Sequence, residues 1–125
     1  MGEKGRDLKR RTKEYALRVI RLYARLSKTD TVAQVLGKQV LGKQVLRSAT
    51  SMGANYREAS RGRSKAEFIS KIGDSLKEIE ESDYWLELLV DSGRVPTALM
   101  ADLRDETSQL IAILTTIAKN SKRNP

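Results

Sequence analysis

The 125-residue chain contains no cysteine and no histidine. Without cysteine, a disulfide framework, a thiolate metal site and a cysteine nucleophile are excluded. Without histidine, the commonest general base, the Ser-His-Asp arrangement and most zinc and di-iron sites are excluded as well. The sequence also has no glycine-rich phosphate loop. We therefore expect a protein that is not an enzyme and that binds no cofactor or metal.

Long apolar runs are also missing. No stretch approaches the roughly 20 apolar residues that a membrane-spanning helix requires. The N-terminal segment MGEKGRDLKRR lacks the apolar stretch of a signal peptide. These absences predict a cytoplasmic protein that does not contact a membrane.

Proline is rare, with Pro96 and the terminal Pro125 as the two instances, and apolar residues recur at helical spacing. Ser64 and Glu67 form a predicted capping box, and Gly93 suits a left-handed helix end. The predicted helices span residues 7–28, 30–59, 64–92 and 96–119. Four helices, short connections and no strand pattern predict a single all-α domain, an antiparallel up-down four-helix bundle.

Each predicted helix carries one apolar face that is expected to form the core. Asp83 falls on the face of the third helix, so its burial would require a partner such as Arg47 or Tyr15. The predicted core residues are Tyr15, Val19, Leu22, Tyr23, Leu26, Leu41, Val45, Ala49, Met52, Tyr56, Phe68, Ile72, Leu76, Ile79, Leu86, Val90, Leu99, Leu103, Leu110, Ile113, Leu114 and Ile117.

The pentapeptide LGKQV occurs twice, within residues 36–45. Five residues advance an α-helix by about 500°, or about 140° past a whole turn, so the two copies should present different faces. Solenoid units have 20 residues or more, which excludes a repeat architecture. We interpret one copy as an insertion: the downstream copy keeps the core register, and the upstream copy is displaced toward the helix start.

The net charge of +8 is unevenly distributed. Residues 1–28 hold ten basic and three acidic residues (10 − 3 = +7), and residues 74–106 hold three basic and ten acidic residues (3 − 10 = −7). Opposite charges of this kind allow copies to dock head to tail. The first helix also carries six candidate nucleic-acid-binding residues: Lys9, Arg10, Lys13, Arg18, Arg21 and Arg25. Because this basic set lacks interleaved surface aromatics and a helix-turn-helix motif, such binding would be phosphate-dominated and indifferent to sequence. A simply solvated basic face is the alternative.

Other polar groups favour structural roles over chemistry. Ser51, Asn55 and Glu58 share one helix face, where we expect them to bond to one another and to the neighbouring loop, or to lie at a subunit interface. Tyr84 and Trp85 cannot both face the core, which indicates an interface anchor. The acidic residues Glu78, Glu81, Asp83 and Glu87 are interpreted as a solvated or docking face, in preference to a metal site.

The stretch QVLRSATSMGANYREASRGRSKAEFISKIGDSLKEIEESDYWLELL resembles the four-helix bundle proteins encoded in intervening sequences of bacterial large-subunit ribosomal RNA genes. The matching residues are Gln44, Arg47, Ser48, Ser51, Asn55, Glu58, Ser64, Glu67, Phe68, Ser75, Leu76 and Glu78. The likeness extends over about residues 7–118. Two departures are Ala59, where the family usually has glycine, and the extra LGKQV copy, which suggests replication slippage or deliberate engineering.

The resemblance implies a bundle that assembles as a ring of five. It also implies kinship to the accessory protein of diversity-generating retroelements, which looks like a basic barrel that binds the reverse transcriptase and nucleic acid. Expected partners are therefore further copies of this chain in a homopentamer, RNA or DNA, and a protein. Candidate structural or interface positions are Gln44, Arg47, Ser51, Asn55, Glu58, Asp83 and Trp85.

The favoured interpretation is a non-enzymatic, homo-oligomeric bundle that serves as a basic scaffold for RNA or DNA phosphates. The alternative is a structural or protein-interaction oligomer with no nucleic-acid role. Co-purifying nucleic acid would favour the first over the second.

Overall fold

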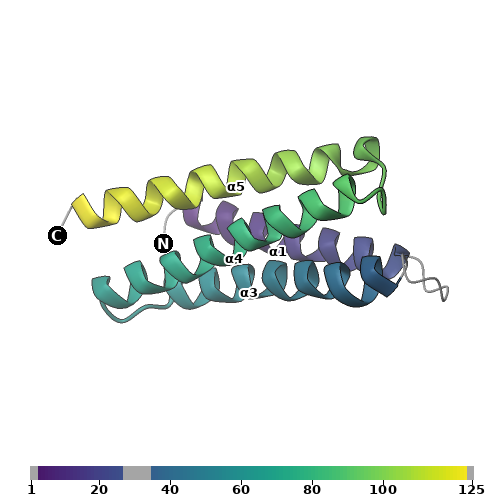
Figure 1. The fold of residues 1–125 in the computed structure, drawn as a ribbon. Coiled ribbons are helices and arrows are strands. Elements are labelled where there is room, and N and C mark those ends of the chain that lie inside the picture. Colours follow the sequence, from purple (N-terminus) through teal and green to yellow (C-terminus); the bar gives the residue numbers. More distant parts are fainter. Residues whose placement is uncertain (1–2, 27–34, 124–125) are drawn as a thin grey trace.

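The computed structural model describes residues 3–26 and 35–123, which form an all-α, antiparallel four-helix bundle (Figure 1). Its elements are α1 (Glu3–Arg25), the π-helix η1 (Val35–Gly42), α3 (Lys43–Ser60), α4 (Lys65–Asp91) and α5 (Thr97–Arg123). The two ends of the chain and the turn at residues 61–64 lie at one end of the bundle, and the turn at residues 92–96 lies at the other (Figure 1).

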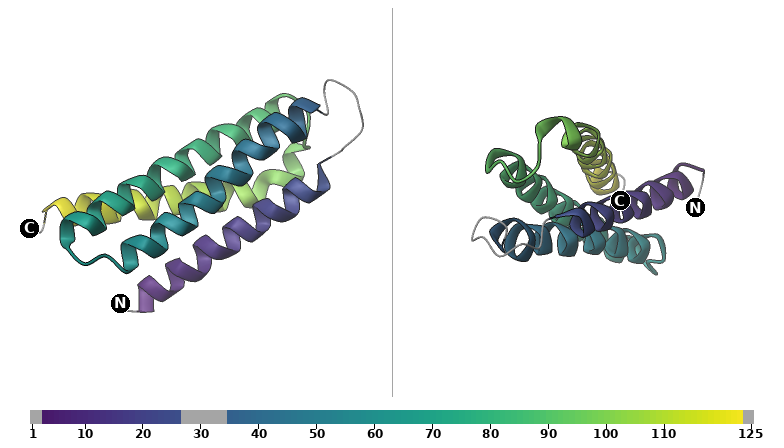
Figure 2. Two further views of the ribbon diagram at one scale, coloured as in Figure 1. Left: turned by 90° about the horizontal axis from the view of Figure 1, so that it is seen from below. Right: turned by 90° about the vertical axis from the view of Figure 1, so that its right-hand side faces the viewer.

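The four interfaces between neighbouring helices are unequal. α3 packs most extensively against α4, and the α4–α5 and α1–α3 interfaces are also broad. α1 and α3 run side by side in Figure 2, whereas α1 makes only slight contact with α5. Both clefts described below lie along this loose α1–α5 seam.

The helix ends follow local signals in the sequence. The Ser64 hydroxyl accepts a hydrogen bond from the Glu67 backbone N–H at 3.1 Å, and the Glu67 carboxylate accepts one from the backbone N–H of Arg63 at 3.2 Å. Gly93 follows α4 with a φ of 77°, the left-handed conformation that glycine adopts readily.

Several element bounds differ from the expected ones. α1 begins at Glu3 and α5 continues to Arg123, so both outer ends are longer than the spans 7–28 and 96–119. The expected end at residue 28 and the expected start at residue 30 lie outside the described residues.

Two predicted core positions are wrong. Leu99 is 77% exposed, while Met100 is 1% exposed, because the buried face of α5 begins one residue later. On α4 the buried face passes through Ser82, and Asp83 is only half-buried beside it. Most other predicted positions are buried or pack against the core, including Tyr15, which is completely buried.

Two pairs of buried hydroxyl groups lie in the core and together take one residue from each helix. The Tyr15 hydroxyl lies 2.8 Å from Thr107 Oγ1, and Ser48 Oγ lies 2.7 Å from Ser82 Oγ. Because Thr107 donates its own hydrogen to the Leu103 carbonyl, Tyr15 is the donor to Thr107. Each buried hydroxyl is thus satisfied inside the bundle.

We expected the repeated pentapeptide to lie within one α-helix over residues 30–59. Instead, it lies largely in the π-helix η1, whose hydrogen bonds join residue i to residue i+5. The repeat also has a period of five residues. A hydrogen bond of this helix type therefore joins a residue of the first copy to the equivalent residue of the second copy. A π-helix accommodates extra residues without interrupting the helix that follows.

Equivalent residues of the two copies have different environments. Val40 is 45% exposed, whereas Val45 is fully buried. Lys38 is buried, donates to the Leu26 carbonyl at 3.3 Å and lies 4.8 Å from the centre of the Tyr23 ring, whereas Lys43 is exposed. The α-helical core register is therefore carried by the downstream copy.

We expect deletion of residues 41–45 to lower the free energy of unfolding by less than about 2 kcal/mol. The product is identical to a deletion of residues 36–40, so one copy always remains to supply the residues of α3. The main loss is the Lys38 hydrogen bond to Leu26. Urea denaturation measures the change.

The matched control removes residues 50–54, which include the fully buried Met52, and should prevent folding. If the repeat deletion were as damaging as this control, the second copy would be integral to the bundle.

Candidate nucleic-acid interface

The six basic residues predicted to bind nucleic acid all lie on α1. Arg10, Lys13, Arg21 and Arg25 are exposed, and Lys9 and Arg18 are half-buried. They spread along most of the helix, so the structure does not gather them into a single site.

Arg10 is already engaged by acids of its own helix. Its guanidinium lies 2.6 Å from Asp7 and 3.1 Å from Glu14, and the hydrogen bond to Asp7, followed by that to Glu14, raises the pKa of Arg10. The neighbouring Arg11 reaches across to α5 and pairs with Glu106 at 2.6 Å. Two arginines in the N-terminal half of α1 are therefore paired with carboxylates, whereas Lys9 and Lys13 form no ion pair within residues 3–26 and 35–123.

The C-terminal half of α1 differs, because it lines a groove that contains no acid. Arg18, Arg21 and Arg25 border this groove of about 450 Å³, which lies against the start of α5. Within the described part of the chain, none of the three forms an ion pair. Three of the six predicted residues thus converge on one concave site.

Arg94 joins the groove from the turn between α4 and α5 and was missed by sequence reasoning. The up-down topology brings this turn to the same end of the bundle as the end of α1 (Figure 1). The available signal was a single base between the helix-ending Gly93 and Pro96, whose distance from α1 only the topology reveals. The apolar lining consists of Leu22, Leu26, Val95, Pro96, Leu99, Met100 and Leu103.

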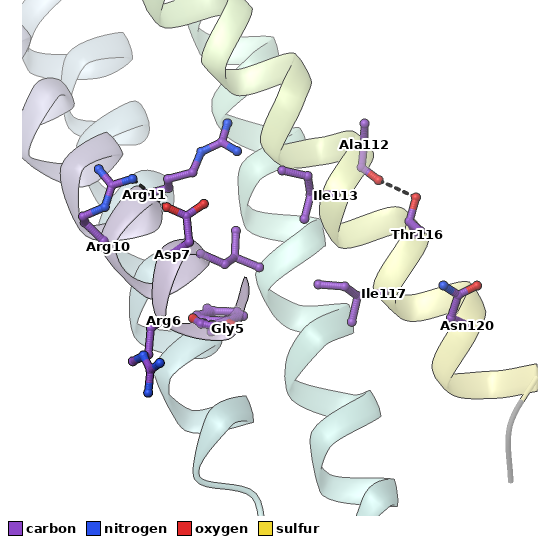
Figure 3. A pocket seen from close by; sticks show the side chains of 12 residues that line it. Gly5, Arg6, Asp7, Arg10, Arg11, Ala112, Ile113, Thr116, Ile117 and Asn120 are labelled. Carbon is purple, nitrogen blue, oxygen red and sulfur yellow. Dashed lines mark hydrogen bonds and ion pairs between the residues drawn. The ribbon is translucent and has the colours of Figure 1, made fainter. Parts of the chain in front are cut away.

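A larger cleft of about 1070 Å³ opens at the other end of the same seam (Figure 3). Ile113 and Ile117 project from α5 toward the first turns of α1, and Tyr56 of α3 contributes to the lining. The Tyr56 hydroxyl donates to the Gly5 carbonyl at 3.2 Å. Arg6, Arg10 and Arg11 border this cleft together with Asp7, and Arg10 and Arg11 are paired with carboxylates. The smaller groove is lined by four arginines and, among the described residues, by no acidic residue, so it is the stronger anion site.

The polar residues of the α3 motif stabilise the bundle through contacts with α4. Arg47 binds two carboxylates of α4, Glu81 at 2.8 Å and Glu78 at 3.2 Å, and these contacts, above all the bond to Glu81, raise the pKa of Arg47. Glu58 pairs with Lys71 at 2.7 Å and raises the pKa of that lysine.

The remaining motif residues have few contacts of this kind. Ser51, Asn55 and Gln44 are half-buried. No side-chain hydrogen bond joins Ser51, Asn55 and Glu58 among the described residues, which contradicts the expected mutual bonding.

Asp83 binds neither suggested partner among the described residues, because Arg47 is engaged by Glu78 and Glu81. The Tyr15 hydroxyl donates to Thr107 instead. Trp85 packs against the core, and its buried indole N–H has no hydrogen-bond partner within the described part of the molecule. Tyr84, with its ring centre 5.2 Å from that of Trp85, is 54% exposed. The two aromatic residues thus face in different directions, as their adjacency requires.

Residues 3–26 and 35–123 include no cluster of three or more acidic residues that is arranged to hold a metal ion. In the same ranges, no helix is both long and apolar enough to cross a membrane.

Comparison with known proteins gives a family match, similarity to solved structures and one negative result. The family model for 23S rRNA-intervening sequence protein matches residues 7–116. A crystal structure from Bacteroides thetaiotaomicron, a protein with unknown function from the S23 ribosomal protein family solved at 1.70 Å, is 34% identical, with a TM-score of 0.77. That match covers 93% of this chain and 98% of the other. No curated protein matches the chain.

The helical architecture, the match over residues 7–116 and the 34% identity to a solved member agree with the resemblance carried by the α3–α4 motif. The chain belongs to the 23S rRNA-intervening sequence protein family.

Proposed function

We propose that the protein is a non-enzymatic, homo-oligomeric scaffold that binds RNA or DNA through backbone phosphates. The observation that carries this proposal is the groove bordered by Arg18, Arg21, Arg25 and Arg94. No acidic residue lines it, so the four positive charges are available to an external anion. Arginine suits phosphate because its planar guanidinium donates two parallel hydrogen bonds.

The position of α5 adds to the attraction. Its first turn contains no acidic residue, and Pro96, Leu99 and Met100 place this end of the helix in the groove. The partial positive charge at a helix N-terminus favours a phosphate there. Binding of this kind depends on the phosphate charges of the nucleic-acid backbone and is indifferent to base sequence.

A salt series tests the proposal. We expect affinity for labelled RNA and DNA to fall steeply with salt, with each phosphate contact contributing about 0.7–0.9 to the slope of log K against log[salt]. The variant Arg18→Gln/Arg21→Gln/Arg25→Gln should lower this slope by about 2–3. The matched control, Arg57→Gln/Arg61→Gln/Arg63→Gln, changes exposed arginines at the opposite end and carries the same net charge of +5 (8 − 3).

Equal losses in the two variants would show that binding follows net charge alone and would remove the groove from the proposal. If the unaltered protein bound neither RNA nor DNA at low salt, the nucleic-acid role would be wrong. A structural or protein-interaction oligomer would then be the remaining function.

Self-association forms the second part of the proposal. The exposed face of α1 carries Leu17 and Ile20 among basic residues, which is unusual for a solvated helix. On α4, Tyr84 is exposed on a face shared with the acidic Glu80, Glu87 and Asp91, which are spaced at helical intervals. An apolar centre with basic surroundings is complementary to an aromatic centre with acidic surroundings.

We propose that these two faces join neighbouring copies head to tail. Contacts between different faces close into a ring when the rotation allows, and a pentamer is the expected ring. The solution mass, measured in the same salt series, reports on this assembly, and a monomer at every salt concentration would contradict it. A protein partner is a further proposed ligand of the assembled scaffold.

A further inference from the structure

The groove between α1 and α5 combines an apolar surface with four arginines that form no ion pair among the described residues. Val95, Met100 and Leu103 line the groove and are buried, so this part of its surface is formed before any ligand arrives. Leu99, by contrast, is 77% exposed and lies beside the arginines. Within residues 3–26 and 35–123, a side chain so exposed contributes little to packing.

We infer that this groove selects single-stranded over double-stranded nucleic acid by receiving one unstacked nucleotide, its phosphate on the arginines and its base against Leu99. This inference rests on the proposed function and names its ligand more closely. A groove of about 450 Å³ lies within the range of small-ligand sites.

The chemistry of the two nucleic-acid forms explains the selection. A duplex offers phosphates to the arginines, but its bases are paired and stacked inside and cannot reach an apolar side chain in a groove. A single strand offers both groups, because its bases can turn outward.

The groove has no aromatic residue to stack on the base. Arginine guanidinium planes stack on bases, however, and Arg18, Arg21 and Arg25 lie at spacings of three and four residues along one face of α1. Pro96 and Leu99 add apolar contact from the other side. Stacking on an aromatic residue is worth about 1–3 kcal/mol per base, so this aliphatic site should give a smaller preference of roughly tenfold.

The charge distribution favours nucleic acid over other anionic amphiphiles of similar size. Residues 18, 21 and 25 extend over seven positions, about 10 Å along the helix axis. A row of cations of this length matches successive phosphates of one strand better than a single acidic group.

The test compares oligouridine, oligothymidine and a duplex of matched length as ligands of the full chain. We expect both single strands to bind roughly tenfold more tightly than the duplex at a salt concentration that screens distant charges. Leu99→Ser should reduce the affinity for the single strands about fivefold and leave the duplex affinity unchanged. Because Leu99 is exposed, the substitution should not affect folding.

Val40→Ser is the matched control, since Val40 is 45% exposed and lies outside the groove. It should change neither affinity. Arg94→Gln should weaken single strands and duplex alike, because it removes a phosphate contact and no apolar one.

Equal affinity for single strands and duplex, or an unchanged ratio in Leu99→Ser, would overturn the inference and leave the phosphate-binding scaffold intact. Failure of all three nucleic acids to bind would instead overturn the proposed function, and the inference with it.

Discussion

Replacing Tyr15 with alanine is expected to lower the free energy of unfolding by about 3–5 kcal/mol. Tyr15 is fully buried, and its hydroxyl hydrogen-bonds Thr107 of α5. Removal of the ring leaves a cavity that rigid neighbours fill only partly. It also removes the hydrogen-bond donor to Thr107 Oγ1.

Urea denaturation measures this loss, and two further variants divide it into parts. Tyr15→Phe keeps the ring and should cost about 1 kcal/mol, the usual net value of one hydrogen bond. Val40→Ala, at an exposed position outside the proposed interface and the groove, should change stability by about 0.5 kcal/mol or less. If Tyr15→Ala cost no more than Val40→Ala, the ring would not be part of a close-packed core.

The protein is expected to lose about 2–3 kcal/mol of stability between pH 10 and pH 12 through Tyr15 alone. Burial raises the pKa of Tyr15 from 10.0 to about 12, because the charged phenolate is poorly solvated inside the bundle. Below pH 10 both the folded and the unfolded states hold the proton, and the stabilisation is complete. Above pH 10 the unfolded chain releases the proton first, so stability falls until the folded state also ionises near pH 12.

Tyr15→Phe isolates this effect from other groups that titrate at high pH. Burial also raises the pKa of Tyr56, so the unaltered protein and the variant share that contribution. The variant starts about 1 kcal/mol less stable at neutral pH, and the two stability curves should cross between pH 10 and pH 12. Parallel curves over this range would show that Tyr15 ionises equally easily in both states.

Much of the fold follows from spacing in the sequence. Apolar residues at intervals of three and four positions, a capping box at Ser64 and Glu67, and glycine at position 93 together predict helices that the structure contains. The same spacing does not show which of two adjacent apolar positions on a helix is buried. Leu99 and Met100 are both apolar, and only the approach of the neighbouring helices decides that Met100 is buried.

The two buried hydroxyl pairs mark a clearer limit of the sequence. Ser48, Ser82 and Thr107 have the polarity of surface residues, and nothing local indicates that each lies opposite another hydroxyl group. Their burial is tolerable only because the partners come from different helices. Asp83 was predicted to lie on the apolar face of its helix. The neighbouring Ser82 is the buried residue, and Asp83 is half-buried beside it.

The sequence predicted only part of the candidate site. The row of arginines on α1 stood out as a basic helix, but which of them are paired with carboxylates depends on Asp7, Glu14 and Glu106. Two of these acids are close in sequence. Glu106 is 95 residues away from Arg11, and no spacing rule connects such distant positions.

The sequence by itself determined the four helices, the excess of positive charge on α1 and the absence of cysteine and histidine chemistry, because helix periodicity and composition are local properties. The tertiary structure alone decided three other features: the π-helical form of the repeated pentapeptide, the buried hydroxyl pairs in the core and the meeting of Arg94 with the arginines of α1. Each depends on residues that are distant in the chain, or on a choice between helix types that packing resolves. Such contacts exist only after the helices have assembled.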